Sequence, residues 1–143
     1  MAVELDHPFS TARGLEDSYA VILDLDRVIP CVEGGSVIER TSPESAKAEI
    51  KVKMGAMSMT FVGTVTVAEK DEAAHRALLR VKSRDKGGSG YANADVTFDV
   101  DDGGGNIHTA AQISGKAASM GEGVVHSVLD ALINDFTRKL AAI

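Results

Sequence analysis

Apolar and charged residues alternate without a break from Ala46 to Met54. This is the period of a β-strand with one buried face. The apolar side opens with two alanines, Ala46 and Ala48, at positions where a packed core would hold larger side chains. Protein interiors are filled to a packing density of about 0.74–0.76. A sheet lined by such small residues must therefore be pressed closely by a helix or enclose a space, and an enclosed space is our first hypothesis for function.

The same two-residue period recurs along the chain. Between residues 90 and 101, small or apolar residues alternate with polar ones, and Ala92 and Ala94 lie on the inner side. Residues 107–113 follow the same pattern, with Ala111 inside. Glycine-containing turns separate the later segments. The alternation predicts strands at residues 3–9, 36–40, 46–54, 57–67, 75–84, 90–101 and 107–113.

Two regions follow a helical period instead. Residues 11–29 carry apolar residues at spacings that favour two short helices, stopped by Pro30. A broad apolar stripe runs through residues 120–140, and Ser119 with Glu122 has the pattern of a capping box. The expected order is one strand, two short helices, six strands and one long helix. This order predicts an α+β fold, in which a curved antiparallel sheet wraps around the final helix and leaves an apolar cavity.

The overall composition narrows the class of protein. The chain has 143 residues, expected to form one domain over 1–143, and its fractions of 44% hydrophobic and 25% charged residues are those of a soluble protein. Acidic residues outnumber basic ones by 21 to 15, which disfavours binding to nucleic-acid phosphates. No apolar run is long enough to span a bilayer, and Glu4 and Asp6 stand where a signal peptide would be positive. The single cysteine, Cys31, excludes an internal disulfide and fits a reducing cytoplasm.

One stretch departs from the acidic balance. Basic residues outnumber acidic ones between Lys70 and Lys86. This stretch could bind anionic lipid head groups or an acidic partner. It could equally be the solvated outer face of a strand, and composition alone does not separate the two.

Side chains suited to acid–base, nucleophilic or metal chemistry do not converge in the predicted interior, so we assign no catalytic or metal-binding residue. His7 is the only histidine on an inner strand face, and we interpret it as a core histidine in preference to a catalytic one. His75, His108 and His126 fall on separate elements, without the spacing of a metal site. Cys31 lacks a second thiol, which favours a buried or turn cysteine over a nucleophile.

The candidate ligand-binding residues are the large apolar side chains on the inner strand faces and on the helix stripe. Met54, Met57 and Met59 crowd one hairpin, where their flexible thioethers could either fill the core or form a deformable mouth of the cavity. We predict that the cavity is lined by Ile50, Val52, Met59, Phe61, Leu79, Val96, Phe98, Ile113, Val125, Leu129 and Leu132.

Four short motifs occur in a fixed order along nearly the whole chain. They are Val28-Ile29-Pro30-Cys31-Val32, Lys53-Met54-Gly55 leading to Phe61-Val62-Gly63-Thr64-Val65, Gly90-Tyr91-Ala92 leading to Val96-Thr97-Phe98, and Ile113-Ser114-Gly115-Lys116-Ala117 before Gly121. Together they resemble the CoxG family of carbon monoxide dehydrogenase proteins, within the START-like, helix-grip superfamily, also called SRPBCC. One departure is that no glycine follows Pro30 directly, where the family has an IPG turn.

The resemblance implies a START-like ligand-binding domain in a protein encoded alongside molybdenum-containing CO dehydrogenase and related hydroxylases. Family members are implicated in recruiting that enzyme to the membrane or in connecting it with the quinone pool. They often continue past the long helix into a tail that can meet the membrane. Because this sequence stops at Ile143, we expect that tail to be absent here. The implied location is cytoplasmic, with peripheral association at the inner face of the cell membrane.

Three functions remain open at this point. The first is a non-enzymatic carrier that holds an apolar lipid, an isoprenoid quinone such as menaquinone or ubiquinone, with no covalent cofactor, and links CO dehydrogenase to the quinone pool. The second is an assembly or membrane-recruitment factor that transports no ligand. The third is a cyclase or hydrolase of the same fold, which would need inward acids or a partnered histidine. We favour the first, since burying each CH₂ group of a tail is worth about 0.8 kcal/mol without any catalytic group.

Overall fold

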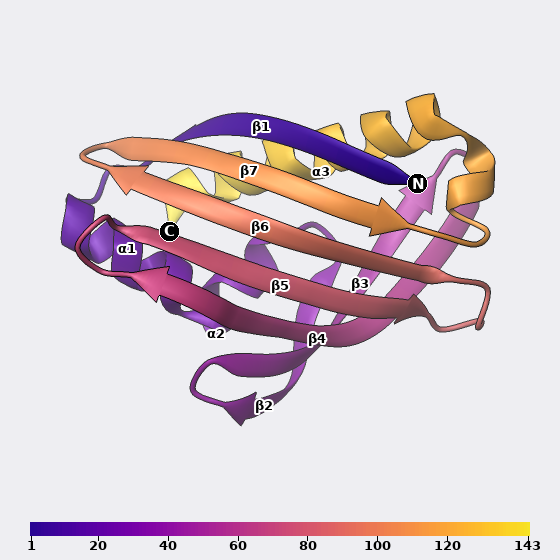
Figure 1. Ribbon diagram of the computed structural model, residues 1–143, viewed down its shortest axis with the longest axis horizontal. Helices are drawn as coiled ribbons and strands as arrows, with labels where there is room; N and C mark the ends of the chain where they lie inside the picture. Colours follow the sequence, from indigo (N-terminus) through magenta and orange to yellow (C-terminus); the bar gives the residue numbers. More distant parts are fainter.

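Seven antiparallel β-strands form one curved sheet in the computed structural model, which describes residues 1–143 (Figure 1). The spatial order of the strands is β1-β7-β6-β5-β4-β3-β2. Each strand from β2 to β7 therefore pairs with its successor in the chain, and β1 pairs with β7. All seven predicted strands are confirmed. Their bounds are β1 (Ala2–Ser10), β2 (Gly35–Ser42), β3 (Ser45–Met54), β4 (Met57–Asp71), β5 (Arg76–Asp85), β6 (Tyr91–Asp101) and β7 (Gly104–Ile113).

Short helices join β1 to β2, and a long helix follows β7. The connection consists of α1 (Leu15–Leu23), α2 (Leu25–Val28) and the 3₁₀ turn η1 (Ile29–Cys31), which contains Pro30. A second 3₁₀ turn, η2 (Ala118–Met120), leads into α3 (Glu122–Ala142). In Figure 1, α3 lies behind the sheet and runs along β1. The predicted α+β helix-grip architecture is confirmed.

The start of α3 differs from the predicted capping box. Ser119 lies in η2, and its hydroxyl donates to the carbonyl oxygen of Lys116 instead of capping α3. Gly121 precedes the helix with φ of 97°, a left-handed conformation that glycine adopts without steric cost. The sharp turn between η2 and α3 therefore needs the glycine, and the serine belongs to the preceding turn.

Gly63 lies where β4 passes closest to β5. It is paired with Ala48 of β3 on one side and Ser83 of β5 on the other. A Cβ atom added at this position would lie 1.9 Å from the carbonyl oxygen of Lys82, far inside van der Waals contact. Figure 1 shows β4 curving from its β3 partner round to its β5 partner. The glycine thus permits the close strand approach that this curvature requires.

The apolar core is divided into two clusters. The first joins α1 and α2 to Phe98 and to the end of α3 around Phe136. The second joins the start of β1 and the β3–β4 hairpin to the start of α3 at Val125. Apolar residues between the clusters, such as Ala94 and Leu132, are only half-buried. Side chains that belong fully to neither cluster indicate that the middle of the sheet faces a space.

Candidate functional site: an apolar cavity

A cavity of about 280 Å³ lies between the sheet and α3. Its wall is formed by side chains of α2, η1, strands β3 to β7 and α3, and 25 of its 32 lining residues are hydrophobic. The wall takes residues from both apolar clusters, for example Phe98 from the first and Phe61 from the second. The cavity therefore occupies the gap between the two packed parts of the core.

All but one of the residues predicted to line the cavity border it. Met59 is the exception, since it is buried in the second cluster and does not reach the cavity. It packs at the hairpin end of the sheet, which η2 and the start of α3 cover. Met54 does border the cavity, so the methionine hairpin divides between wall and core. The lining residues shared with the prediction are Ile50, Val52, Phe61, Leu79, Val96, Phe98, Ile113, Val125, Leu129 and Leu132.

Small residues on the sheet create the room for the cavity. Ala94 of β6 and Ala111 of β7 are directly paired and both border it, as does Ala48 of β3. Ala46, two residues before Ala48 on the same face, is completely buried in the first cluster. Both alternatives drawn from the sequence therefore occur on one strand. The chain is pressed closely at Ala46, and the space opens at Ala48.

The remaining wall comes from the segment between the short helices and β2. Val28, Ile29 and Val32 border the cavity there. Sequence reasoning missed these residues because they lie on a short helix, a 3₁₀ turn and a loop, without strand alternation. The available signal was their apolar character next to Pro30.

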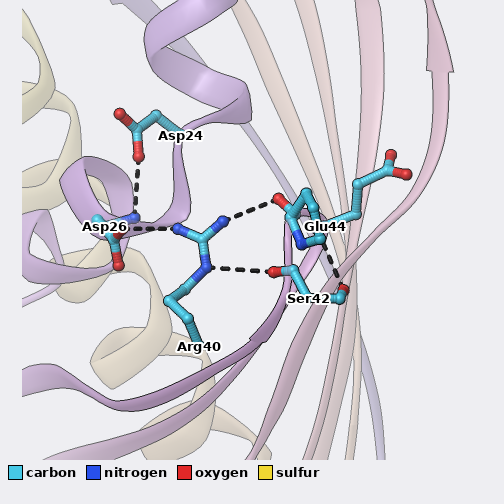
Figure 2. Close-up of polar contacts among 6 residues, drawn as sticks. Asp24, Asp26, Arg40, Ser42 and Glu44 are labelled. Atoms are coloured by element: carbon cyan, nitrogen blue, oxygen red, sulfur yellow. Dashed lines mark hydrogen bonds and ion pairs between the residues drawn. The ribbon is translucent and has the colours of Figure 1, made fainter.

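Arg40 of β2 fixes this part of the wall (Figure 2). Its Nη1 lies 2.7 Å from Oδ2 of Asp26 on α2, and its Nη2 donates to the carbonyl oxygen of Pro43 at 2.8 Å. Asp24 in turn caps α2 by accepting a hydrogen bond from the Asp26 backbone N–H at 3.2 Å. One guanidinium thus connects α2 to the β2–β3 turn. Because α2 contributes Val28 to the wall, this contact positions one side of the cavity.

Polar groups are scarce along the wall. Glu49 is its only charged residue, and it is half-buried. The hydroxyl of Ser83 donates to the carbonyl oxygen of Ala92 at 2.5 Å, so its hydrogen is already used. Thr109 is 4% exposed, and its hydroxyl has no hydrogen-bond partner. The cavity therefore suits an apolar molecule, with one buried and unpaired hydroxyl in its wall.

His7 is buried on β1, as predicted, and it has a partner that the sequence pattern did not indicate. Nε2 of His7 lies 2.7 Å from Oδ1 of Asp130 on α3. Because a carboxylate only accepts hydrogen bonds, Nε2 carries the proton of this contact. Neither residue borders the cavity, and the Asp130 side chain is 47% exposed. The pair joins helix and sheet, and a molecule in the cavity does not touch it.

The other candidate residues lie apart from the cavity. Cys31 is buried, its Sγ donates to the carbonyl oxygen of Arg27, and burial raises the pKa of its thiol. Such a thiol is a poor nucleophile at neutral pH because little of it is ionised. No three His, Cys, Asp or Glu side chains form a group that could hold a metal ion.

The basic stretch between Lys70 and Lys86 is largely paired on the outer face of the sheet. Arg76 and Arg80 of β5 lie 2.6 and 2.9 Å from Asp99 and Asp95 of β6. Lys70 lies 3.3 Å from Glu44. These ion pairs favour the interpretation of this stretch as a solvated strand face.

None of the helices combines the length and the apolar character needed to cross a lipid bilayer.

Solved structures with this architecture include three that cover 99% of the chain. A conserved protein from Geobacillus kaustophilus has a TM-score of 0.79 at 19% identity, with 93% of its own chain covered. The protein TTHA0849 from Thermus thermophilus has a TM-score of 0.70 at 10% identity and 98% coverage of its chain. The Zhui aromatase/cyclase from Streptomyces sp. R1128 has a TM-score of 0.64 at 11% identity and 93% coverage. At these identities the likeness extends to the fold alone.

The sequence itself identifies the family. No curated protein matches it closely enough to serve as a relative. The family model for CoxG, the G-type subunit of carbon monoxide dehydrogenase, however, matches residues 8–142, which include every element from the end of β1 to α3. The resemblance seen in the four sequence motifs is thereby confirmed, and the chain belongs to the CoxG family.

Proposed function

We propose that this protein is a non-enzymatic accessory protein that holds an isoprenoid quinone in its cavity and links a molybdenum CO dehydrogenase to the membrane quinone pool. The observation that carries the proposal is the apolar cavity between the sheet and α3, with hydrophobic residues at 25 of its 32 lining positions. Membership of the CoxG family supports the partner enzyme. A soluble oxidoreductase cannot easily reach a quinone buried in lipid, and a protein that shields the ligand would lower that barrier.

The cavity volume bears on how much of a quinone would be enclosed. At about 280 Å³ it lies close to the lower end of the ~300–1,000 Å³ range of small-molecule pockets. This space suits a ring and the first part of a tail, with the rest of a long tail extending beyond the wall. Each enclosed CH₂ group would contribute about 0.8 kcal/mol. Affinity should therefore rise with tail length at first and then level off.

An enzyme of the same fold is the competing hypothesis, because the Zhui protein is an aromatase/cyclase. The best candidate for acid–base chemistry in this chain is the pair of His7 and Asp130. General acid–base catalysis requires a group within hydrogen-bond reach of the substrate. Since neither residue borders the cavity, the pair is poorly placed for such a role.

Two measurements test the proposal. Organic extraction of the purified protein followed by mass spectrometry should release a quinone. Titration with quinone analogues of increasing tail length should give an affinity that rises with the first isoprene units. An affinity indifferent to tail length would contradict the carrier role and leave a role in assembly or membrane recruitment.

Blocking variants connect the binding to this cavity. Ala111→Phe places a ring in the cavity from β7, and Ala94→Trp does so from the paired position on β6. Either should abolish quinone binding, although overpacking costs about 1–3 kcal/mol of stability. Ala110→Phe is the matched control, since Ala110 is the next residue on β7 and does not border this cavity. Undiminished binding in a folded Ala111→Phe protein would place the ligand elsewhere.

A further inference from the structure

Thr109 is the polar exception in the wall of the cavity. It lies on the inner face of β7, paired with Leu5 of β1 and Val96 of β6. Its neighbours on the same face of β7 are Ile107 and Ala111. The side chain is 4% exposed and borders the cavity, and its hydroxyl has no hydrogen-bond partner.

An unpaired hydroxyl at this position needs an explanation. The large majority of buried side-chain polar atoms in proteins have at least one partner, because burial removes their hydrogen bonds to water. Ser83, the other buried hydroxyl in the wall, follows the rule by donating to the Ala92 carbonyl oxygen. A valine would fill the space of Thr109 without leaving a polar atom unpaired. The threonine is therefore suited to a partner that arrives with a ligand.

The charges of the wall restrict what that partner can be. No lysine, arginine or histidine borders the cavity, and its one charged residue is the acidic Glu49. A carboxylate or phosphate head group would thus be buried without a counter-ion and near a negative charge, which is strongly unfavourable. A neutral carbonyl oxygen carries no such penalty, and it accepts a hydrogen bond from a hydroxyl.

We infer that the Thr109 hydroxyl is the hydrogen-bond donor that holds the polar head of the ligand inside the cavity. It selects neutral apolar molecules with a carbonyl oxygen over fatty acids and phospholipids, and it orients the ring inward with the tail toward the outside. This inference rests on the proposed function, since it names the chemistry by which that same cavity recognises its ligand.

A pair of probes isolates the carbonyl group. Menadione is a neutral quinone without a tail, and methylnaphthalene has the same ring skeleton without carbonyl oxygens. Thr109→Val removes the hydroxyl at nearly constant volume, whereas Thr109→Ser keeps it. Thr97→Val is the control, because Thr97 lies on β6 outside the cavity. Each protein is titrated with both probes, and its fold is checked by circular dichroism.

The expected result is a specific loss for one probe in one variant. Thr109→Val should bind menadione about fivefold more weakly, the effect of one net hydrogen bond. The same variant should bind methylnaphthalene as tightly as the natural protein, or more tightly. Thr109→Ser and Thr97→Val should keep the preference for menadione. The infrared carbonyl band of bound menadione should lie at lower frequency with Thr109 than with valine, a shift that a merely structural role of Thr109 would not produce.

Other outcomes would overturn the inference. If Thr109→Val changes the affinity for both probes equally, or for neither, the hydroxyl serves the protein alone, for instance through a water shared with the unpartnered Nδ1 of His7. If methylnaphthalene binds the natural protein and menadione does not, the cavity accepts apolar molecules without the proposed selection. If neither probe binds, both this inference and the proposed function fail.

Discussion

Asp130 of α3 accepts a hydrogen bond from His7 of β1 over 2.7 Å, which connects residues 123 positions apart in the chain. His7 is buried, and the Asp130 side chain lies at the protein surface. The contact therefore closes the final helix over the first strand and holds one edge of the curved sheet. It is also a polar contact made without any part of the cavity wall.

Removing this contact should loosen α3. Asp130→Ala leaves the ring of His7 buried with both nitrogens unpaired, since Nδ1 has no partner to begin with. We expect the free energy of unfolding to fall by about 1–2 kcal/mol in urea denaturation. His7→Gln should be destabilising for the same reason, with more effect on stability than on any activity. Asp135→Asn is the control, because the ion pairs of Asp135 with Arg138 and Lys139 lie within α3 and should cost less. Equal losses for the two aspartates would argue against a special role of the His7 contact.

The same substitution should have opposite effects at two glycines. Gly63→Ala forces a methyl group against the Lys82 carbonyl oxygen, and we expect a loss of about 1–3 kcal/mol of stability. Gly123→Ala lies in α3 with no atom within 4 Å of the new Cβ, and it should stabilise the protein by about 0.5–1 kcal/mol. Thermal unfolding of both variants checks the prediction. A neutral Gly63→Ala would mean that β4 and β5 can separate at this point without cost.

The histidine on the outer face of β7 should titrate above its usual range. Hydrogen bonding to Asp6 at 2.9 Å raises the pKa of His108, and Glu4 adds a smaller effect in the same direction. Because the folded state favours the protonated ring, its stabilising contribution is complete below the ordinary value of 6.5. The contribution is then lost as the pH rises through the higher pKa of the folded state. Proton NMR of the ring should show the raised midpoint. Asp6→Asn should lower it more than Glu4→Gln does, and the reverse order would contradict the assignment.

The contact made by Arg40 should control local motion more than global stability. Exposed ion pairs contribute about 0–1 kcal/mol, so Arg40→Gln should change the unfolding midpoint little. It does release α2 from the β2–β3 turn. Amide hydrogen exchange should therefore accelerate in α2 and η1 while the central strands stay protected. Arg138→Gln, which breaks an ion pair within α3 alone, is the control. Unchanged exchange in α2 would show that apolar packing of Leu25 suffices to hold it.

The fold could be predicted because each element carries its own period. Alternation located the seven strands, and the stripe on α3 located the long helix. The division between wall and core could not be predicted, since Ala46 and Ala48 have the same pattern and differ only in what packs above them. The contacts of Arg40 with Asp26 and of His7 with Asp130 depend on how distant elements meet, which a local period does not encode. The unpaired hydroxyl of Thr109 was equally hidden, because its position on an inner face was visible but its lack of a partner was not.

The division of the apolar core into two clusters has a consequence for cooperativity. When the cavity is empty, few side chains transmit packing from the cluster around Phe98 to the cluster around Phe61. The two ends of the sheet are then joined chiefly by backbone hydrogen bonds, so each end can open as a unit of its own. An occupant of the cavity touches residues of both clusters at once. Its binding would convert two weakly coupled folding units into one, and loss of the ligand at a membrane would return the protein to its more pliable form.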